Sequence, residues 1–277
     1  MVDEDDTLTR TYARFAAGEL PAGVAAMQAL ALVDSAAAAR ERLPAEAEAL
    51  RTLLTDAAHR LVRDMLALAD EEPGTAQGWA AVFDRAAALS PEGSVALYSL
   101  GDPERLEAAT REVTDWLRAE RLVAPDRRAL EIGCGIGRFL QALAGAVDVF
   151  VGLDVSAAMC AEARRRIADQ PGAAVVRTSG ADLAAFADEA FDVVLAVDSM
   201  PYLVDAGLTD LMLDEAARVL RPGGEIVVLN WSYRGDHALD QAEMRRAAER
   251  LGLEVVERPT PTLVHWDGAV HRMRKPC

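Results

Sequence analysis

One short segment near the middle of the chain, Ala129–Phe139, constrains the fold more than any other. It reads Ala-Leu-Glu-Ile-Gly-Cys-Gly-Ile-Gly-Arg-Phe, an apolar run followed by three alternating glycines and the start of a helical pattern. Glycine adopts positive φ without a steric penalty and lets a ligand approach the backbone, because it has no Cβ. A buried strand leading into such a loop is typical of nucleotide-type sites in open α/β sheets. The segment therefore predicts a parallel sheet with a ligand site at its carboxyl edge.

The rest of the second half fits this interpretation, because short apolar segments alternate with helical ones from about Asp102 onwards. Such alternation predicts parallel strands with crossover helices. A short link containing Trp266-Asp267-Gly268 joins the last two expected strands. It is too short for a parallel crossover, so the final pair is expected to be antiparallel. The expected strands are Arg128–Ile132, Val147–Asp154, Ala174–Thr178, Phe191–Val197, Glu225–Asn230, Leu253–Arg258 and Ala269–Met273; the expected helices are Pro103–Glu120, Phe139–Ala144, Ala157–Asp169, Leu208–Leu220 and Asp240–Leu251.

The first half has a different pattern. Residues 7 to about 90 are rich in alanine and are interrupted by Pro21, Pro44 and Pro73-Gly74, which predicts three or four helices. The best-formed, Ala45–Ala69, carries apolar residues at steps of three and four along one stripe. We expect two domains, residues 1–100 and 101–277. The helical part is either a structural bundle, which can form a homodimer, or a cap over the site.

Charge and cysteine content exclude several classes of protein. Of the 277 residues, 29 are Lys or Arg and 45 are Asp or Glu, giving a net charge of −16. This balance argues against nucleic acid as a partner. No apolar run approaches the ~20 residues of a membrane span, and the first residues are acidic, unlike a signal peptide. Cys134, Cys160 and Cys277 lack C-x-x-C spacing, so they indicate neither a disulfide framework nor a zinc site. We therefore expect a cytoplasmic protein with reduced thiols.

An acidic residue completes the glycine loop. The next expected strand ends at Asp154, whose carboxylate can accept both hydroxyls of an unphosphorylated ribose. The dinucleotide fingerprint G-x-G-x-x-G needs a glycine where this chain has Arg138. A nicotinamide-dependent oxidoreductase is therefore disfavoured.

The combined motifs resemble the class I S-adenosylmethionine-dependent methyltransferases. The resemblance covers roughly residues 103–277. It is carried by Leu-Glu-Ile-Gly-Cys-Gly-Ile-Gly (130–137), Gly-Leu-Asp-Val-Ser (152–156), Phe-Asp-Val-Val-Leu (191–195) and Arg-Val-Leu-Arg-Pro-Gly-Gly (218–224). It implies an α/β fold with a Rossmann-like seven-stranded sheet, mostly parallel with a C-terminal antiparallel hairpin, preceded by the N-terminal helical subdomain. It also implies methyl transfer from S-adenosylmethionine to a small-molecule acceptor.

The resemblance further implies a set of cofactor residues. Glu131 and the amides around Gly133 and Gly135 would hold the methionine end, Asp154 the ribose, and Val155 would flank the adenine. The family often has an acid for adenine recognition where this chain has Gly180, so Ala181 or Asp182 is left to contact the base, although Asp182 is equally suited to capping a helix. The full implied set is Glu131, Gly133, Cys134, Gly135, Asp154, Val155, Met159, Ala181, Asp182 and Val197.

The acceptor side is expected in the loops after the fourth and fifth strands. Asp198 and Tyr202 follow the fourth strand and His265 precedes the last, and we expect these three catalytic candidates to converge. One of them would act as a general base if the acceptor is a hydroxyl. Asp198 with Asn230 is too poor in acids for a magnesium site, so no metal is expected. Trp231, Tyr233 and Trp266 are candidates for an aromatic acceptor pocket.

The cofactor motifs leave one alternative open. A protein that binds S-adenosylmethionine or S-adenosylhomocysteine without methylating, or that performs other chemistry on the same fold, would carry the same motifs.

Overall fold

The computed structural model of the protein describes residues 4–69, 73–258, 261 and 263–277. The chain forms two compact units that do not follow chain order: Met1–Glu72, Arg85–Glu112 and Thr262–Asp267 make up the first, and Pro73–Asp84, Val113–Pro261 and Gly268–Cys277 make up the second. The expected domain boundary between residues 100 and 101 stays a prediction, because the two units are defined by their internal contacts and not by whether each part folds alone.

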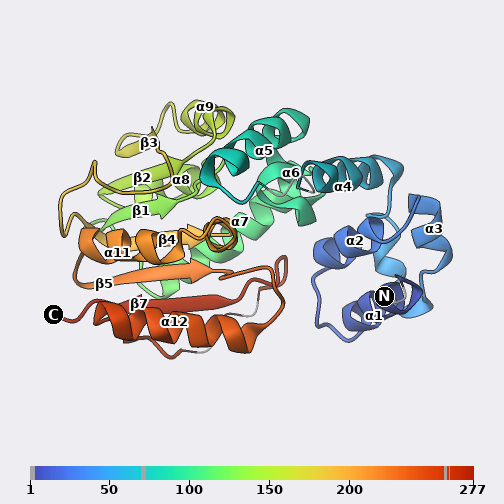
Figure 1. Ribbon diagram of the computed structural model, residues 1–277. Helices are drawn as coiled ribbons and strands as arrows, with labels where there is room; N and C mark the ends of the chain where they lie inside the picture. The colour runs from blue at the N-terminus through green and yellow to red at the C-terminus, as the bar shows by residue number, and fades with distance from the viewer. Residues whose placement is uncertain (1–3, 70–72, 259–260, 262) are drawn as a thin grey trace. The chain divides into compact units, whose positions relative to one another are not determined.

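The second unit is built on a seven-stranded sheet of order β3-β2-β1-β4-β5-β7-β6 (Figure 1). Neighbouring strands from β3 through β5 pair in parallel, whereas β7 runs antiparallel to both β5 and β6. This confirms the predicted fold class, with a helical N-terminal region before the sheet. The strands are β1 (Arg128–Ile132), β2 (Val149–Asp154), β3 (Ala173–Arg177), β4 (Phe191–Val197), β5 (Leu220–Leu229), β6 (Glu254–Val255) and β7 (Val270–Arg274).

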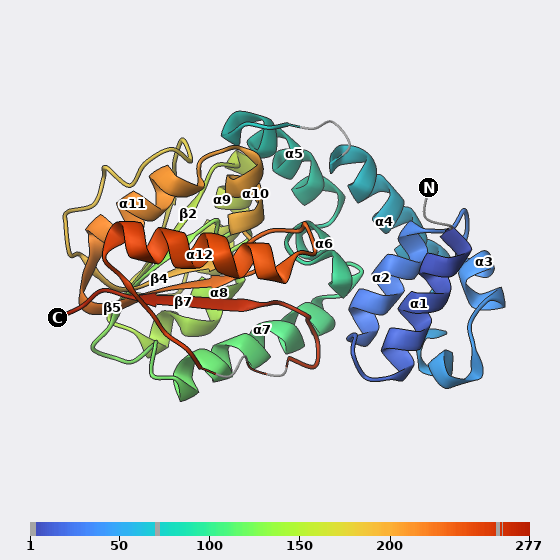
Figure 2. The ribbon, with the colours of Figure 1, turned by 60° about the horizontal axis from the view of Figure 1, so that its bottom comes forward.

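Helices cover both faces of the sheet. The helices α11 and α12 lie along one face (Figures 1 and 2), and α8 lies on the other, where Leu140 packs against Gly152 of β2. The helices are α1 (Glu4–Ala16), α2 (Ala22–Ala31), α3 (Ala36–Glu41), α4 (Asp56–Ala69), α5 (Ala76–Leu89), α6 (Pro91–Val95), α7 (Pro103–Ala119), α8 (Arg138–Leu143), α9 (Ala157–Arg166), α10 (Met200–Asp205), α11 (Thr209–Val219) and α12 (His237–Leu251), with short 3-10 helices η1 (Ala45–Leu50), η2 (Leu97–Ser99) and η3 (Ala144–Ala146).

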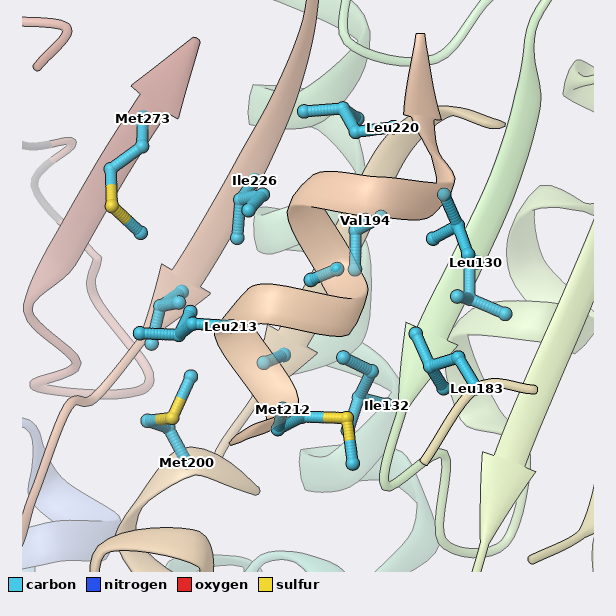
Figure 3. Packing of buried hydrophobic residues seen from close by; sticks show 14 of the residues in the cluster. Leu130, Ile132, Leu183, Val194, Met200, Met212, Leu213, Leu220, Ile226 and Met273 are labelled. Carbon is cyan, nitrogen blue, oxygen red and sulfur yellow. The ribbon is translucent and has the colours of Figure 1, made fainter. Parts of the chain in front are cut away.

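The core of this unit lies between the sheet and its outer helices. Alternate residues of the strands, such as Leu130, Ile132 and Val194, point toward Met212 and Leu213 of α11 (Figure 3). These side chains are at most 6% exposed. Successive residues of a strand face opposite sides of the sheet. Burial of this apolar set therefore fixes the orientation of each strand and, with it, the residues that lie at the carboxyl edge.

Two local predictions were wrong. The stripe Ala45–Ala69 is not one helix: η1 ends at Leu50, and α4 starts only at Asp56. The Oγ1 atom of Thr55 accepts a hydrogen bond from the Ala58 N–H at 3.1 Å and caps α4, as Thr does at helix starts. The strand expected over Leu253–Arg258 is also shorter than predicted, since β6 spans only Glu254–Val255. It pairs antiparallel with β7 as expected, and part of the link between the two strands lies outside the described residues.

The N-terminal part contains more helices than expected. Instead of three or four α-helices, the described residues between 7 and about 90 contribute to five, α1, α2, α3, α4 and α5. The Tyr12 hydroxyl of α1 donates to the Ala39 carbonyl of α3 at 2.8 Å.

Across the described ranges, no helix has both the length and the apolar character needed to span a bilayer.

Candidate cofactor and acceptor site

The glycine loop after β1 has the backbone that its sequence predicts. Gly133, Gly135 and Gly137 have φ values of 71°, 53° and 76°, a region that other residues rarely adopt. A Cβ at position 133 would collide with Cβ of Ser199. The Ser199 hydroxyl donates to the Ile132 carbonyl at 2.5 Å, which ties the end of β4 to the end of β1. Glycine is therefore required at position 133 by both conformation and space.

Asp154 joins this loop to the end of β2. Its Oδ2 atom accepts a hydrogen bond from the Gly135 N–H at 2.8 Å, and its Oδ1 atom accepts one from the Ser156 N–H at 2.9 Å. Burial raises the pKa of Asp154, and the backbone hydrogen bonds oppose that rise. The carboxylate is thus oriented by two amides at the point where the ribose acid is predicted.

Glu131 fits a cationic group. The side chain is 1% exposed and its Oε2 atom has no hydrogen-bond partner. Burial raises its pKa to about 8, although Arg138 acts in the opposite direction. An unpaired buried carboxyl oxygen is costly. The ammonium group of a methionine moiety would supply the missing partner, so Glu131 is suited to hold that end of S-adenosylmethionine.

We expect ligand binding at Glu131 to release a proton. With a pKa of about 8, Glu131 is mostly protonated in the free protein at pH 7, whereas an ammonium partner favours the carboxylate. Calorimetry of S-adenosylhomocysteine binding at pH 7, in buffers of different ionisation enthalpy, should show release of up to about one proton. Glu131→Gln should abolish the release and weaken binding. A wild-type binding enthalpy that does not vary with the buffer would contradict this prediction.

The same shift predicts how stability depends on pH. The folded-state pKa of Glu131 lies above its ordinary value of 4.5. The protonated side chain therefore contributes fully to the free energy of unfolding below about pH 4.5, and this contribution is lost as pH rises through about 8. Chemical denaturation of the ligand-free protein should therefore show Glu131→Gln gaining stability relative to wild type between these pH values. A difference in the free energy of unfolding between the two proteins that stays constant across this pH range would contradict the expectation.

The adenine side departs from the family pattern for a steric reason. Gly180 has a φ of 79°, and a Cβ there would lie 2.8 Å from Cγ1 of Val155 and 3.1 Å from Cβ of Ala76. The Ala181 N–H donates to Oγ of Ser179 at 3.3 Å. Oδ1 of the exposed Asp182 accepts from the Ala184 N–H at 3.0 Å. This contact closes a turn and is not the helix cap that was the alternative for Asp182, because residues 182–190 form no helix. The role of Asp182 toward adenine stays a prediction.

The remaining cofactor candidates are packed residues. Cys134 is buried beside Gly152, and burial raises the pKa of its thiol well above the ordinary value. A thiol held protonated is a poor nucleophile, so Cys134 serves packing in the loop. Met159 is buried in the first turn of α9, and Val197 is buried at the end of β4.

Asp198 and Asn230 form a polar pair at the ends of β4 and β5. They have φ values of 55° and 65°, which Asp and Asn tolerate better than most residues. Oδ1 of Asp198 accepts hydrogen bonds from Nδ2 of Asn230 at 2.7 Å and from the Tyr233 hydroxyl at 3.0 Å. The Asn230 amide oxygen accepts from the Ala269 N–H at 3.0 Å. Asn230 therefore orients Asp198.

A cluster of aromatic rings adjoins Asp198 through Tyr233. The Tyr202 ring packs edge-on against Trp79, Phe83 and Tyr233, with centroid distances of 4.6, 4.9 and 5.9 Å. Burial and the Asp198 carboxylate raise the pKa of Tyr202 to about 12. Tyr202 therefore keeps its proton at neutral pH and can donate a hydrogen bond, but it is unsuited to act as a base.

The other acceptor candidates make contacts of their own. His265 belongs to the first unit, where its N–H donates to Glu112 at 3.1 Å. Its convergence with Asp198 and Tyr202 stays a prediction. Trp231 is 1% exposed and donates to Glu243 at 3.0 Å, so it is a core residue. Trp266 stacks on Tyr98 in the first unit.

Sequence reasoning missed two residues of the aromatic cluster, Trp79 and Phe83. They are four residues apart on α5, a spacing that puts side chains on the same helix face. This spacing of two aromatic residues is the sequence feature that could have indicated their role. It was overlooked because the whole N-terminal half was interpreted as one helical part.

Comparisons with known proteins agree with this geometry. Residues 129–224 match the sequence profile of the family described as "Methyltransferase domain". This match identifies a methyltransferase domain over residues 129–224. With the sheet order and the glycine loop, it agrees with the resemblance to the class I S-adenosylmethionine-dependent methyltransferases. S-adenosylmethionine is the cofactor of this class.

Two curated relatives and one solved structure illustrate the similarity. The 27-O-demethylrifamycin SV methyltransferase of Amycolatopsis mediterranei is 35% identical over 52% of this chain and 53% of its own. Methyltransferase GfsG of Streptomyces halstedii is 32% identical over 47% of each chain. The chain thus spans about half the length of these relatives. A methyltransferase structure from Aquifex aeolicus has a TM-score of 0.48 and 17% identity, covering 63% of this chain and 93% of its own.

Proposed function

We propose that the protein transfers the methyl group of S-adenosylmethionine to a small-molecule acceptor. The observation that carries the proposal is the combination of Glu131, with its unpartnered buried oxygen, and Asp154, oriented by the glycine loop, within the matched domain. These two carboxyl groups suit two polar parts of the cofactor, the ammonium of its methionine moiety and the hydroxyls of its ribose.

The cofactor supplies an electrophilic methyl group on a sulfonium, and its transfer mainly requires alignment of donor and acceptor. Gly133 and Gly135 leave the backbone open to the methionine end, and Asp154 holds the ribose. At the ends of β4 and β5, Asp198 is held by Asn230 and Tyr233. From there it can accept a proton from an acceptor hydroxyl.

The proposal also covers partners and location. The net charge of −16 argues against nucleic acid as the acceptor. The thiols of Cys134 and Cys160 are free and buried, which suits the reducing cytoplasm. A homodimer through the N-terminal helices is the proposed assembly, and light scattering of the purified protein would test it.

Two measurements test the function. Calorimetry should detect binding of S-adenosylmethionine and S-adenosylhomocysteine but not of NAD. Transfer of an isotope-labelled methyl group to a panel of small molecules should then yield a labelled product. Since one relative's name specifies a 27-O-demethyl compound, hydroxyl-bearing molecules come first in the panel. Tight cofactor binding with no labelled product from any class of acceptor would favour the non-methylating alternative.

A further inference from the structure

We propose that Asp84, a residue of α5 outside the matched domain, is a positioning residue for the ribose-binding carboxylate of Asp154. This inference rests on the cofactor half of the proposed function. Asp84 belongs to the short segment Pro73–Asp84, which comes from the N-terminal half of the chain but is part of the sheet-containing unit.

The link between the two carboxylates is Ser156. Oδ1 of Asp84 accepts a hydrogen bond from the Ser156 hydroxyl at 2.5 Å and from the Ala158 N–H at 2.9 Å. The same Ser156 donates its N–H to Oδ1 of Asp154 at 2.9 Å. Ser156 is 0% exposed. A displaced Ser156 would therefore shift one of the two amides that orient Asp154.

Asp84 is well placed to remain charged. Burial alone would raise the pKa of Asp84, but hydrogen bonds from Ala158 and Ser156, together with the charge of Arg177, outweigh burial and hold it below the ordinary value. The carboxylate lies at the N-terminus of α9, where the helix dipole favours a negative charge. Asp84 thus fixes the turn between β2 and α9 from outside that turn.

A second contact holds the same helix segment on the other side of the glycine loop. Nε1 of Trp79 donates to Oδ2 of Asp205 in α10 at 2.8 Å. In the sheet, β2 and β4 flank β1, and α9 and α10 follow β2 and β4 along the chain. The segment Ala76–Asp84 is therefore hydrogen-bonded to the start of α9, which follows β2, and to α10, which follows β4. These two contacts hold Asp84 next to Ser156.

Selectivity for the ribose hydroxyls tests this role. The probes are S-adenosylhomocysteine and its 2′,3′-dideoxy analogue, and the measurement is the ratio of their Kd values. Wild type should prefer the hydroxylated ligand by about 10-fold or more. Asp84→Ala should lose most of this preference, whereas Asp84→Asn, which keeps an acceptor for Ser156, should retain it.

A double-mutant cycle separates positioning from general damage. If Asp84 acts through Asp154, the variants Asp84→Ala and Asp154→Ala together should weaken S-adenosylhomocysteine binding by clearly less than the product of their single effects. Ser156→Ala provides a second route to the same loss of preference if Asp84→Ala fails to fold. The exposed Asp64, changed to Asn, is the matched control and should leave both affinities unchanged.

The outcomes distinguish this inference from the proposed function. An Asp84→Ala protein that binds both ligands more weakly but keeps the wild-type ratio would overturn the positioning role alone, since a helix cap would act on both ligands equally. Wild-type protein that binds neither ligand would instead overturn the proposed function.

Discussion

Replacing Asp198 by asparagine is expected to lower kcat roughly 10- to 1000-fold while the Kd for S-adenosylmethionine stays within about threefold, if the acceptor is a hydroxyl. Asparagine tolerates the left-handed backbone of this position, where φ is 55°, so the fold should be preserved. The carboxylate proposed to take the proton is lost, and the proposed cofactor contacts at Glu131 and Asp154 are left unchanged. Steady-state kinetics and calorimetry on the same preparation measure the two effects.

The pH dependence of kcat provides a further check. The rate of wild type should rise with pH through the titration of the base, whereas Asp198→Asn should lose that rise. Tyr233→Phe removes one hydrogen bond to Asp198 and should have a smaller effect than Asp198→Asn. Wild-type turnover in Asp198→Asn would exclude this residue as the base and direct attention to the loop from Trp231 to Arg234.

Asp154→Ala is expected to weaken S-adenosylhomocysteine binding by ~1–3 kcal/mol, or roughly 5- to 150-fold, the scale for unpaired polar groups of a buried ligand. The change also removes the acceptors of the Gly135 and Ser156 amides, so both the ligand contact and the loop geometry are lost. Calorimetric titration gives the affinity, and thermal unfolding reports any loss of stability.

Asp148 provides the matched control for this prediction. It is an exposed residue just before β2, whereas Asp154 ends the same strand. Asp148→Ala should bind S-adenosylhomocysteine like wild type. If Asp154→Ala also retained wild-type affinity, the assignment of Asp154 to the ribose would be wrong.

The strand positions that frame the site were predictable because most of their residues are apolar. Arg128–Ile132 and Phe191–Val197 form β1 and β4 with the predicted bounds. Strands that helices cover on both faces are mainly apolar, and the charged residues within these two are Arg128, Glu131 and Asp192. The glycine loop and Asp154 follow such runs directly, and the local pattern therefore determined their positions.

The prediction over Ala45–Ala69 was wrong for a related physical reason. Ala47, Leu50 and Leu54 are all fully buried, so the apolar stripe correctly marked core positions. A 3-10 helix, a turn and an α-helix can all bury such residues. The cap at Thr55 decided where the chain turns, and a hydrophobic pattern does not register one hydrogen bond from a threonine side chain.

The sequence by itself determined the class of this protein, since the glycine loop, the acid after the second strand and the alternation of strands and helices are all local patterns. Only the tertiary structure decided what surrounds them. Asp84 hydrogen-bonds to Ser156, which lies 72 positions away, and the ring of Trp79 packs on Tyr202. Neither pair has a periodicity or spacing in the chain, because contacts between distant segments arise from the packing of whole elements. For the same reason, the unpartnered oxygen of Glu131 became visible only once its neighbours were in place.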